Sequence, residues 1–238
     1  MIPIKEYITF GDFNSKEMGL YLMSREAPTP DEQTIVESIP GMQGVLDFSG
    51  IYGERIFDNR EITYQFKLIN KPYDKRKYYE TAIKQALMPY GNQMLFDSFN
   101  GRYYWHGKCK SVKVEHDARK RNFIATLVFD CYPFMYAQND YYDDVWDTFS
   151  FDQDVTAFTK FSVQGSRDIV LFNAGSTSLS PEIEATASFV VTDEDGKDYR
   201  FNQGTSTDFT LQLKKGINRF KLKGTGTIAF HFRVEVMG

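Results

Sequence analysis

The stretch from Gly107 to Tyr136 constrains the fold most, because it holds two strand patterns joined by a short polar turn. Residues 112–115 alternate apolar and charged side chains, which is the period-two pattern of a half-buried strand. Residues 123–129 follow the polar cluster 117–122 and are apolar on both faces, which predicts a strand buried on both sides. Pro133 has no N–H to donate and ends this strand. The stretch predicts an antiparallel hairpin, with one structural unit before it and another after it.

Composition narrows the class of protein. The 238 residues include 21 Phe and 15 Tyr, and an aromatic share of 16% favours strands over helices. The formal net charge of −4 gives no electrostatic reason to expect nucleic-acid binding. Residues 1–137 carry 18 Lys+Arg and 17 Asp+Glu, a net charge of +1, whereas residues 138–238 carry 10 and 15, a net charge of −5.

No segment predicts secretion or membrane insertion. The start, MIPIKEYITF, lacks the apolar core of a secretory signal, and no run approaches the roughly 20 apolar residues of a membrane span. We therefore expect a protein that stays in the cytoplasm unless something carries it out. Cys109 and Cys131 fall nearly opposite each other if the hairpin turns near Arg119, so a disulfide is conceivable, but a reducing compartment favours free, buried thiols.

The segments before the hairpin predict an α+β domain with one helix on an antiparallel sheet. Residues 62–68 alternate cleanly and predict a strand. A helix with an apolar stripe over residues 79–87 follows Pro72, and Asp74 can cap its start. The Gly-punctuated segment 45–59 predicts either a pair of short strands or a long arm that reaches away from the core.

After the hairpin, the character of the chain changes twice. Residues 138–154 are rich in Asp but lack the regular ligand spacing of a calcium loop, so we interpret them as a solvated linker. Residues 155–238 contain short strand patterns separated by turn clusters such as Asp195-Gly196 and Gly224-Thr225-Gly226, which predicts a β-sandwich. The predicted strands are Phe158–Val163, Ile169–Phe172, Glu182–Ala187, Phe189–Thr192, Tyr199–Phe201, Asp208–Leu213, Asn218–Leu222 and Thr227–Val236.

A series of short motifs spans nearly the whole chain in a fixed order. They are Phe13-Asn14-Ser15 with Gly19-Leu20, Ile39-Pro40-Gly41 with Gly44, Leu46 and Asp47, Arg60 to Tyr64, Asp130 to Phe134, Asn173-Ala174-Gly175, Ser180 to Ile183, Gly216-Ile217-Asn218 and Ile228-Ala229-Phe230. In this order they resemble the distal tail proteins of long-tailed, siphovirus-type bacteriophages.

The resemblance implies a mainly β structural protein of the virion tail tip, assembled in the host cytoplasm. Residues 1–137 would form a hexameric hub ring that joins the distal end of the tail tube to the tip or baseplate. Residues 138–154 would be the acidic linker, and residues 155–238 a galectin-like β-sandwich. The implied partners are copies of the same chain, the tail tube protein and the tip or baseplate proteins, without a cofactor, a membrane or a specific nucleic acid.

The glycine and proline positions of the first domain have a physical interpretation within this picture. They shape extended arms that can cross onto a neighbouring subunit. The residues that we predict for such an oligomerisation arm are Val45, Phe48, Tyr52, Arg55 and Phe57.

Two other classes of function compete with a structural role. An enzyme is disfavoured because His106, His116 and His231 lie in strand contexts without a catalytic or metal-binding motif, so we predict no catalytic, cofactor or metal site. A carbohydrate-binding module that contacts the host surface is the alternative. Residues 150–238 contain no Trp, but Tyr199 and Arg233 could contact a saccharide.

Overall fold

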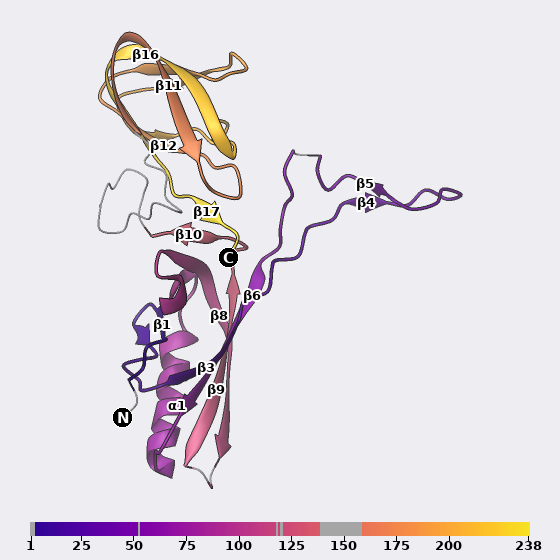
Figure 1. The fold of residues 1–238 in the computed structure, drawn as a ribbon, viewed down its shortest axis with the longest axis vertical. Coiled ribbons are helices and arrows are strands. Elements are labelled where there is room, and N and C mark those ends of the chain that lie inside the picture. The colour runs from indigo at the N-terminus through magenta and orange to yellow at the C-terminus, as the bar shows by residue number, and fades with distance from the viewer. Residues whose placement is uncertain (1–2, 52, 118, 120, 139–158) are drawn as a thin grey trace. The chain divides into compact units, whose positions relative to one another are not determined.

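The computed structural model describes residues 3–51, 53–117, 119, 121–138 and 159–238 (Figure 1). Contacts divide the chain into two compact units, Met1–Met135 with Met237–Gly238, and Tyr136–Val236. The described residues contain antiparallel strands and a single α-helix, which confirms the predicted mainly β class. None of the helical structure in these ranges has the length and apolar character that a membrane crossing requires.

The first unit is an antiparallel sheet in the strand order β2-β1-β7-β8-β9-β6-β3, with a separate pair β4-β5. Its elements are β1 (Ile8–Phe10), β2 (Phe13–Asn14), β3 (Tyr21–Glu26), β4 (Val36–Glu37), β5 (Leu46–Asp47), β6 (Arg60–Leu68), α1 (Tyr73–Leu87), β7 (Gln93–Asp97), the 3-10 turn η1 (Ser98–Asn100), β8 (Tyr103–Asp117) and β9 (Asn122–Cys131).

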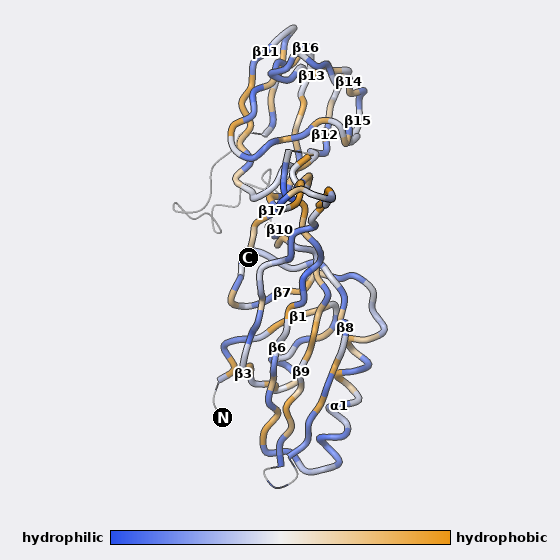
Figure 2. The backbone as a smooth tube through the Cα atoms, turned by 90° about the vertical axis from the view of Figure 1, so that its right-hand side faces the viewer, coloured by the Kyte–Doolittle hydropathy of each residue, from blue (hydrophilic) through white to orange (hydrophobic). Residues whose placement is uncertain are grey.

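Strands β8 and β9 form the predicted hairpin, with Asp117 opposite Asn122 next to the turn. The expectation that β9 is buried on both sides was wrong. Figure 2 shows orange, hydrophobic residues along β9. Their burial nevertheless alternates between fully buried positions, such as Leu127, and half-buried ones, such as Val128. An antiparallel sheet commonly packs one face on the core and leaves the other partly solvated, and the apolar side chains of the second face do not change that.

The two cysteines are free and buried, and they do not face each other. The register places Cys131 opposite Gly107 and Cys109 opposite Phe129. A Cβ at position 107 would lie 2.3 Å from the carbonyl oxygen of Asp130, so only glycine fits beside the Cys131 strand. Burial raises the pKa of the Cys109 thiol to about 11 and that of Cys131 to about 12.

Helix α1 begins directly after Pro72, as predicted, but Asp74 does not cap it, because no side chain bonds the N-terminal N–H groups. Ile83 and Leu87 are buried as the apolar stripe predicted. Arg76 is buried beside them, which hydropathy did not predict. Its guanidinium donates to the carbonyl oxygens at both ends of the β8–β9 turn, at 3.2 Å and 3.1 Å, and so attaches the helix to the hairpin.

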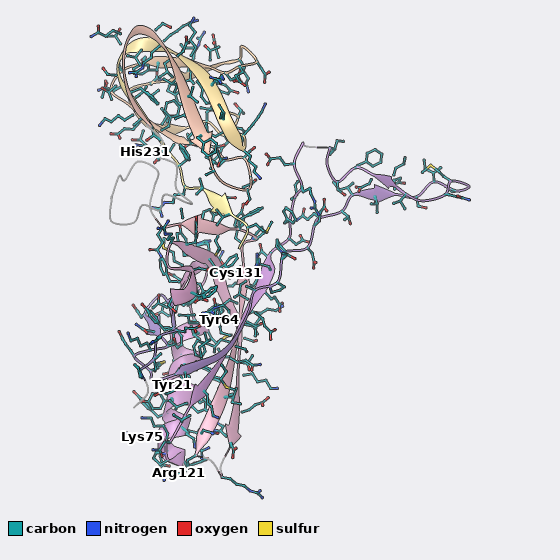
Figure 3. All side chains as sticks on the ribbon, viewed as in Figure 1. Tyr21, Tyr64, Lys75, Arg121, Cys131 and His231 are labelled. Atoms are coloured by element: carbon teal, nitrogen blue, oxygen red, sulfur yellow. The ribbon has the colours of Figure 1, made fainter. Side chains whose placement is uncertain are left out.

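A buried carboxylate links strands that are not neighbours in the first sheet. Asp97 at the end of β7 is 3% exposed and accepts a 2.7 Å hydrogen bond from Arg25 of β3. The hydroxyl of Tyr64 on β6, the residue labelled in Figure 3, donates to the same carboxylate at 2.9 Å. Burial, followed by the charge of Asp97, raises the pKa of Tyr64. The network ties the edge strand β3 to β7.

The second unit is organised around one long strand. Its elements are β10 (Met135–Ala137), which begins at the unit boundary, β11 (Lys160–Asn173), β12 (Glu182–Ala185), β13 (Phe189–Thr192), β14 (Asp198–Phe201), β15 (Gly204–Thr207), β16 (Gly216–His231) and β17 (Glu235–Val236). Strand β16 pairs with the whole length of β11, while its other edge pairs first with β13 and then with β12. The sheet encloses one apolar core, including Phe189, Leu222 and Phe230, as expected of a β-sandwich.

Several predicted strand boundaries of the second unit were wrong. The four strands predicted at 158–163, 169–172, 218–222 and 227–236 form the long strands β11 and β16, followed by the short β17. The segment Gly224-Thr225-Gly226, predicted as a turn, lies inside β16. Gly224 adopts a φ of 153°, and a Cβ there would lie 2.6 Å from the Phe189 ring, so close packing across strands accounts for this glycine.

Two further predictions for the second unit had opposite outcomes. Asp195-Gly196 forms the predicted hairpin turn between β13 and β14, with a φ of 80° at Gly196. Residues 208–213 were predicted as a strand, but the strand is β15 at Gly204–Thr207. Asp208 instead starts a turn, because its carboxylate accepts a 2.9 Å hydrogen bond from the N–H of Thr210.

The substitution Asp97→Ala tests the buried network of the first unit. It leaves the Arg25 guanidinium without its buried partner, so we expect the free energy of unfolding to fall by about 3 kcal/mol. Urea unfolding followed by tryptophan fluorescence measures the change. Glu115→Ala removes a carboxylate from an exposed pair with Lys113 and is the control, and we expect it to unfold at the wild-type urea midpoint. Equal losses in the two variants would contradict a special role for Asp97.

Candidate oligomerisation arm

Residues 27–59, called the arm below, connect β3 to β6 as a two-stranded ribbon (Figure 1). Strands β4 and β5 pair within it, with Val36 opposite Asp47 and Glu37 opposite Leu46. Nearer the sheet, an isolated antiparallel bridge joins the two sides of the arm at positions 32 and 57. The predicted segment 45–59 is therefore one side of the ribbon, and residues 27–39 form the other.

Arg60, the first residue of β6, holds the two ends of the arm together. Its guanidinium is buried and donates a 2.9 Å hydrogen bond to the carbonyl oxygen of Ala27, where the arm begins. It also donates to the carbonyl oxygens of Pro133 and Gly238, at 3.4 Å and 2.8 Å, and lies 4.4 Å from the centre of the Trp105 ring. Burial lowers the pKa of Arg60, which remains charged because arginine starts from 12.5.

The part of the arm next to the sheet has its own polar and aromatic contacts. Arg55 forms an exposed ion pair with Glu32 across the ribbon, and its hydrogen bond lowers the pKa of that carboxyl. The guanidinium lies 5.2 Å from the centre of the Phe57 ring, which makes an edge contact with Phe134 at 5.8 Å. Gln33 adds a 2.7 Å hydrogen bond across the ribbon. These contacts order the inner half of the arm.

The far end of the arm reverses direction at Ile39-Pro40-Gly41-Met42. The N–H of Met42 donates to the carbonyl oxygen of Ile39 at 3.1 Å, which closes a β-turn. Gly41 adopts a φ of 86°, which glycine tolerates and other residues rarely do, and no neighbouring atom lies within 4 Å of the position of a Cβ. The turn therefore requires glycine for its backbone conformation.

The apolar side chains of the arm find no core within the described chain. Its large apolar residues that are 38% to 67% exposed are Ile35, Val36, Ile39, Met42, Val45, Leu46, Phe48, Ile51 and Ile56. A two-stranded ribbon is marginally stable in water by itself. Contiguous exposed apolar surface of this kind marks a site that another molecule covers.

The charged side chains in the outer part of the arm are all negative. Residues 33–53 contain Glu37 and Asp47 but neither Lys nor Arg. Because Glu37 faces Leu46 and Val36 faces Asp47 in the register, each face of the ribbon carries one apolar side chain and one carboxylate. The arm therefore presents an acidic, apolar surface on both faces.

The predicted arm residues lie at different positions along the arm. Val45 and Phe48 are exposed in the outer half, whereas Arg55 and Phe57 make the inner contacts described above. Tyr52 lies outside the described residues. Sequence reasoning missed the apolar residues of the first side, such as Ile35, although the strand pattern at 35–39 before a Pro-Gly turn is the signal that could have found them.

Neither of the two residues predicted for saccharide contact offers an exposed aromatic ring of its own. Tyr199 is 6% exposed, and its hydroxyl donates to the carboxylate of Asp193 at 3.0 Å. Burial raises the pKa of Tyr199 to about 12. Arg233 donates to the carbonyl oxygen of Gln138 at 3.0 Å. A ring packed in the core offers no platform on which a sugar could stack.

No other arrangement in the described chain favours a chemical site. Groups of three His, Cys, Asp or Glu side chains that could hold a metal ion do not occur in those ranges. His231 contacts Glu184 at 3.2 Å near the end of β16, and His116 contacts Glu80 at 2.8 Å. Both are exposed pairs on regular elements, so the arm remains the strongest candidate for a functional surface.

No family model matches the sequence, and neither does any curated protein. The fold, however, is similar to that of solved phage proteins. The crystal structure of Dit from phage SPP1, described as a paradigm of the hub adsorption apparatus in phages that infect Gram-positive bacteria, matches with a TM-score of 0.68 at 12% identity. The match covers 96% of this chain and 98% of that chain.

Two structures of the phage p2 baseplate in its activated conformation also match at 9% identity. The strontium-bound one has a TM-score of 0.45 and covers 97% of both chains, and the calcium-bound one has a TM-score of 0.47 and covers 98% of both. The likeness to Dit confirms the fold that the sequence resemblance implies.

The substitution Arg60→Met tests the attachment of the arm. It removes the charged donor from three carbonyl oxygens, so we expect the free energy of unfolding to fall by about 2 kcal/mol or more. Tryptophan fluorescence during urea unfolding is the measurement, since Trp105 lies beside the guanidinium. Arg55→Met is the matched control, and we expect it to unfold at the wild-type midpoint because its ion pair is exposed. If both variants unfold at the wild-type midpoint, Arg60 does not hold the arm.

Proposed function

We propose that this chain is a structural distal tail protein of a siphovirus-type phage, whose copies form a hexameric hub ring between the tail tube and the tip or baseplate. The observation that carries the proposal is the arm, whose apolar side chains are exposed on a chain with the Dit fold. The number of subunits and the connection of tube to tip rest on the resemblance.

The kind of contact that the arm makes favours a ring. The arm differs from every other surface of the chain, so an arm that docks on another copy makes a heterologous contact, in which two different patches meet. Such contacts repeat from copy to copy and end only when the rotation closes. A closed ring covers every arm, which removes the exposed apolar surface that an isolated chain carries.

The other parts of the proposal follow from the same assignment. Residues 1–137 carry the ring, residues 138–154 are a linker that lies almost wholly outside the described residues, and residues 155–238 dock or space other baseplate proteins. The protein acts without catalysis at the virion tail tip after assembly in the host cytoplasm. Its partners are its own copies, the tail tube protein and the tip or baseplate proteins.

Replacing residues 34–55 by the turn Asn-Gly tests the ring. The bridged positions 32 and 57 stay in place, so we expect the variant to fold and to remain a monomer in light scattering, while the wild type forms rings visible in electron micrographs. Phe48→Ser should weaken the assembly, whereas Phe209→Ser, at a 79% exposed phenylalanine of the second unit, should not. Rings from the chain without its arm would contradict the role of the arm, and a monomeric wild type would contradict the ring.

The carbohydrate-binding alternative depends on the second unit. Charge does not count against this alternative, because residues 159–236 carry 10 Lys+Arg and 9 Asp+Glu, a net charge of +1. We still expect no saturable heat of binding when cell-wall saccharides are titrated into the full chain, because Tyr199 is buried. Saturable binding that is lost in Arg233→Ala would favour the alternative over a purely structural role.

A further inference from the structure

The last two residues of the sequence belong to the first unit, although the whole of the second unit separates them from the rest of it. The chain leaves the first unit after Met135 and returns to it at Met237. The two connecting strands, β10 and β17, pair with each other, and the N–H of Ala137 donates to the carbonyl oxygen of Val234 at 3.1 Å (Figure 1). The second unit is therefore an insertion whose entry and exit lie side by side.

Gly238 packs so closely in the first unit that a side chain there would displace a neighbour. A Cβ at this position would lie 2.1 Å from Cε of Met135 and 3.1 Å from Cη2 of Trp105. Both of these side chains are buried, so they have little room to move aside. Gly238 thus occupies a closely fitted position in the first unit.

The carbonyl group of Gly238 meets the guanidinium that holds the arm. One amino group of Arg60, Nη2, donates to the carbonyl oxygens of Gly238 and Ala27, at 2.8 Å and 2.9 Å. No carboxylate side chain among the described residues pairs with Arg60, and its buried Nε has no hydrogen-bond partner there. Carbonyl groups and the Trp105 ring therefore compensate the buried charge, and the loss of one acceptor weakens the whole arrangement.

We propose that residues 237–238 are a clasp that positions the arm and makes its attachment depend on a completed second unit. In the closed clasp, Gly238 helps to cover the guanidinium and keeps water from the hydrogen bond between Arg60 and Ala27. In a chain whose residues 237–238 have not returned to the first unit, water competes for the N–H groups of Arg60 and weakens that bond. Such a chain holds its arm loosely.

The consequence of the clasp for assembly rests on the ring proposed above. A loosely held arm loses more conformational freedom when it docks, so it binds another copy less tightly. Chains whose second unit is unfinished or misfolded are then disfavoured in the ring. The clasp thereby selects complete copies, all of which hold their arms in the same way.

Hydrogen exchange measured by mass spectrometry tests the clasp on the full chain. The N–H groups of Gln33 and Asp58 each donate across the base of the arm at 2.8 Å. Deletion of residues 237–238 should speed the exchange of both at least about tenfold, because the base of the arm opens more easily. Exchange in β16 of the second unit should stay at the wild-type rate.

The same comparison in the chain with Asn-Gly in place of residues 34–55 separates the clasp from the ring. This change keeps the residues of both hydrogen bonds and removes the part of the arm that docks. The deletion of residues 237–238 should again speed exchange at the base of the arm about tenfold. If it does so only in the chain with the complete arm, the loss of protection comes from the ring, and the clasp is overturned.

Gly238→Leu is a second variant that keeps the length of the chain. Its side chain enters only by displacing Met135 or Trp105, so we expect faster exchange at the base of the arm. Gly91→Leu is the matched control, because no described atom lies within 4 Å of a Cβ at position 91, and it should exchange like the wild type. Unchanged exchange after the deletion, or an equal acceleration in β16, would overturn the clasp.

Ring formation is scored separately, by light scattering. The variants with an open clasp should form fewer rings than the wild type at the same concentration. Equal assembly of the variants and the wild type would overturn the selection of complete copies while the ring stands. A wild type that never associates would overturn the proposed ring, whereas the exchange rates would still decide whether the clasp holds the arm.

Discussion

The buried carboxylate of Asp97 is the contact on which the first unit depends, because it joins strands that the sheet itself does not pair. The Asp97 carboxylate accepts hydrogen bonds from Arg25 near the end of β3 and from Tyr64 on β6. The backbone N–H of Phe99 donates to it at 2.9 Å. A buried carboxylate without these donors would be strongly unfavourable, so the network specifies one arrangement of strands. The arm starts one residue after β3 and ends where β6 begins, and both of its ends therefore rest on this network and on Arg60.

Local patterns in the sequence predicted the elements of the fold well where one face of a strand is buried. The alternation at 62–68 and the stripe on α1 did so because burial recurs with the period of the element. Local patterns could not predict that Gly224 lies inside a strand. Glycine is required there because the ring of Phe189 on the neighbouring strand occupies the space of a Cβ. Contacts between distant residues decide such positions, and a single sequence does not display them.

Charged residues explain why the candidate site could be predicted only in part. Arg60 and Arg76 are buried, although hydropathy places arginine at the surface, and each is held by backbone carbonyl groups that carry no sequence signature. The apolar residues of the arm present the opposite case. Their pattern left short strands and an extended arm open as alternatives. Because strand patterns usually imply a core, only the structure shows that Ile35 and Phe48 have none within the described chain.

The acidic residues of the arm have a second consequence for assembly. An exposed apolar ribbon with free edges tends to pair with a copy of itself. Because Glu37 and Asp47 lie on opposite faces, two arms that stack by either face bring like charges together, and no basic residue between 33 and 53 can relieve the repulsion. The same carboxylates are attracted by a basic surface. Contact between two arms is thus disfavoured, while the exposed apolar side chains of the arm remain able to pack on a surface of a different kind.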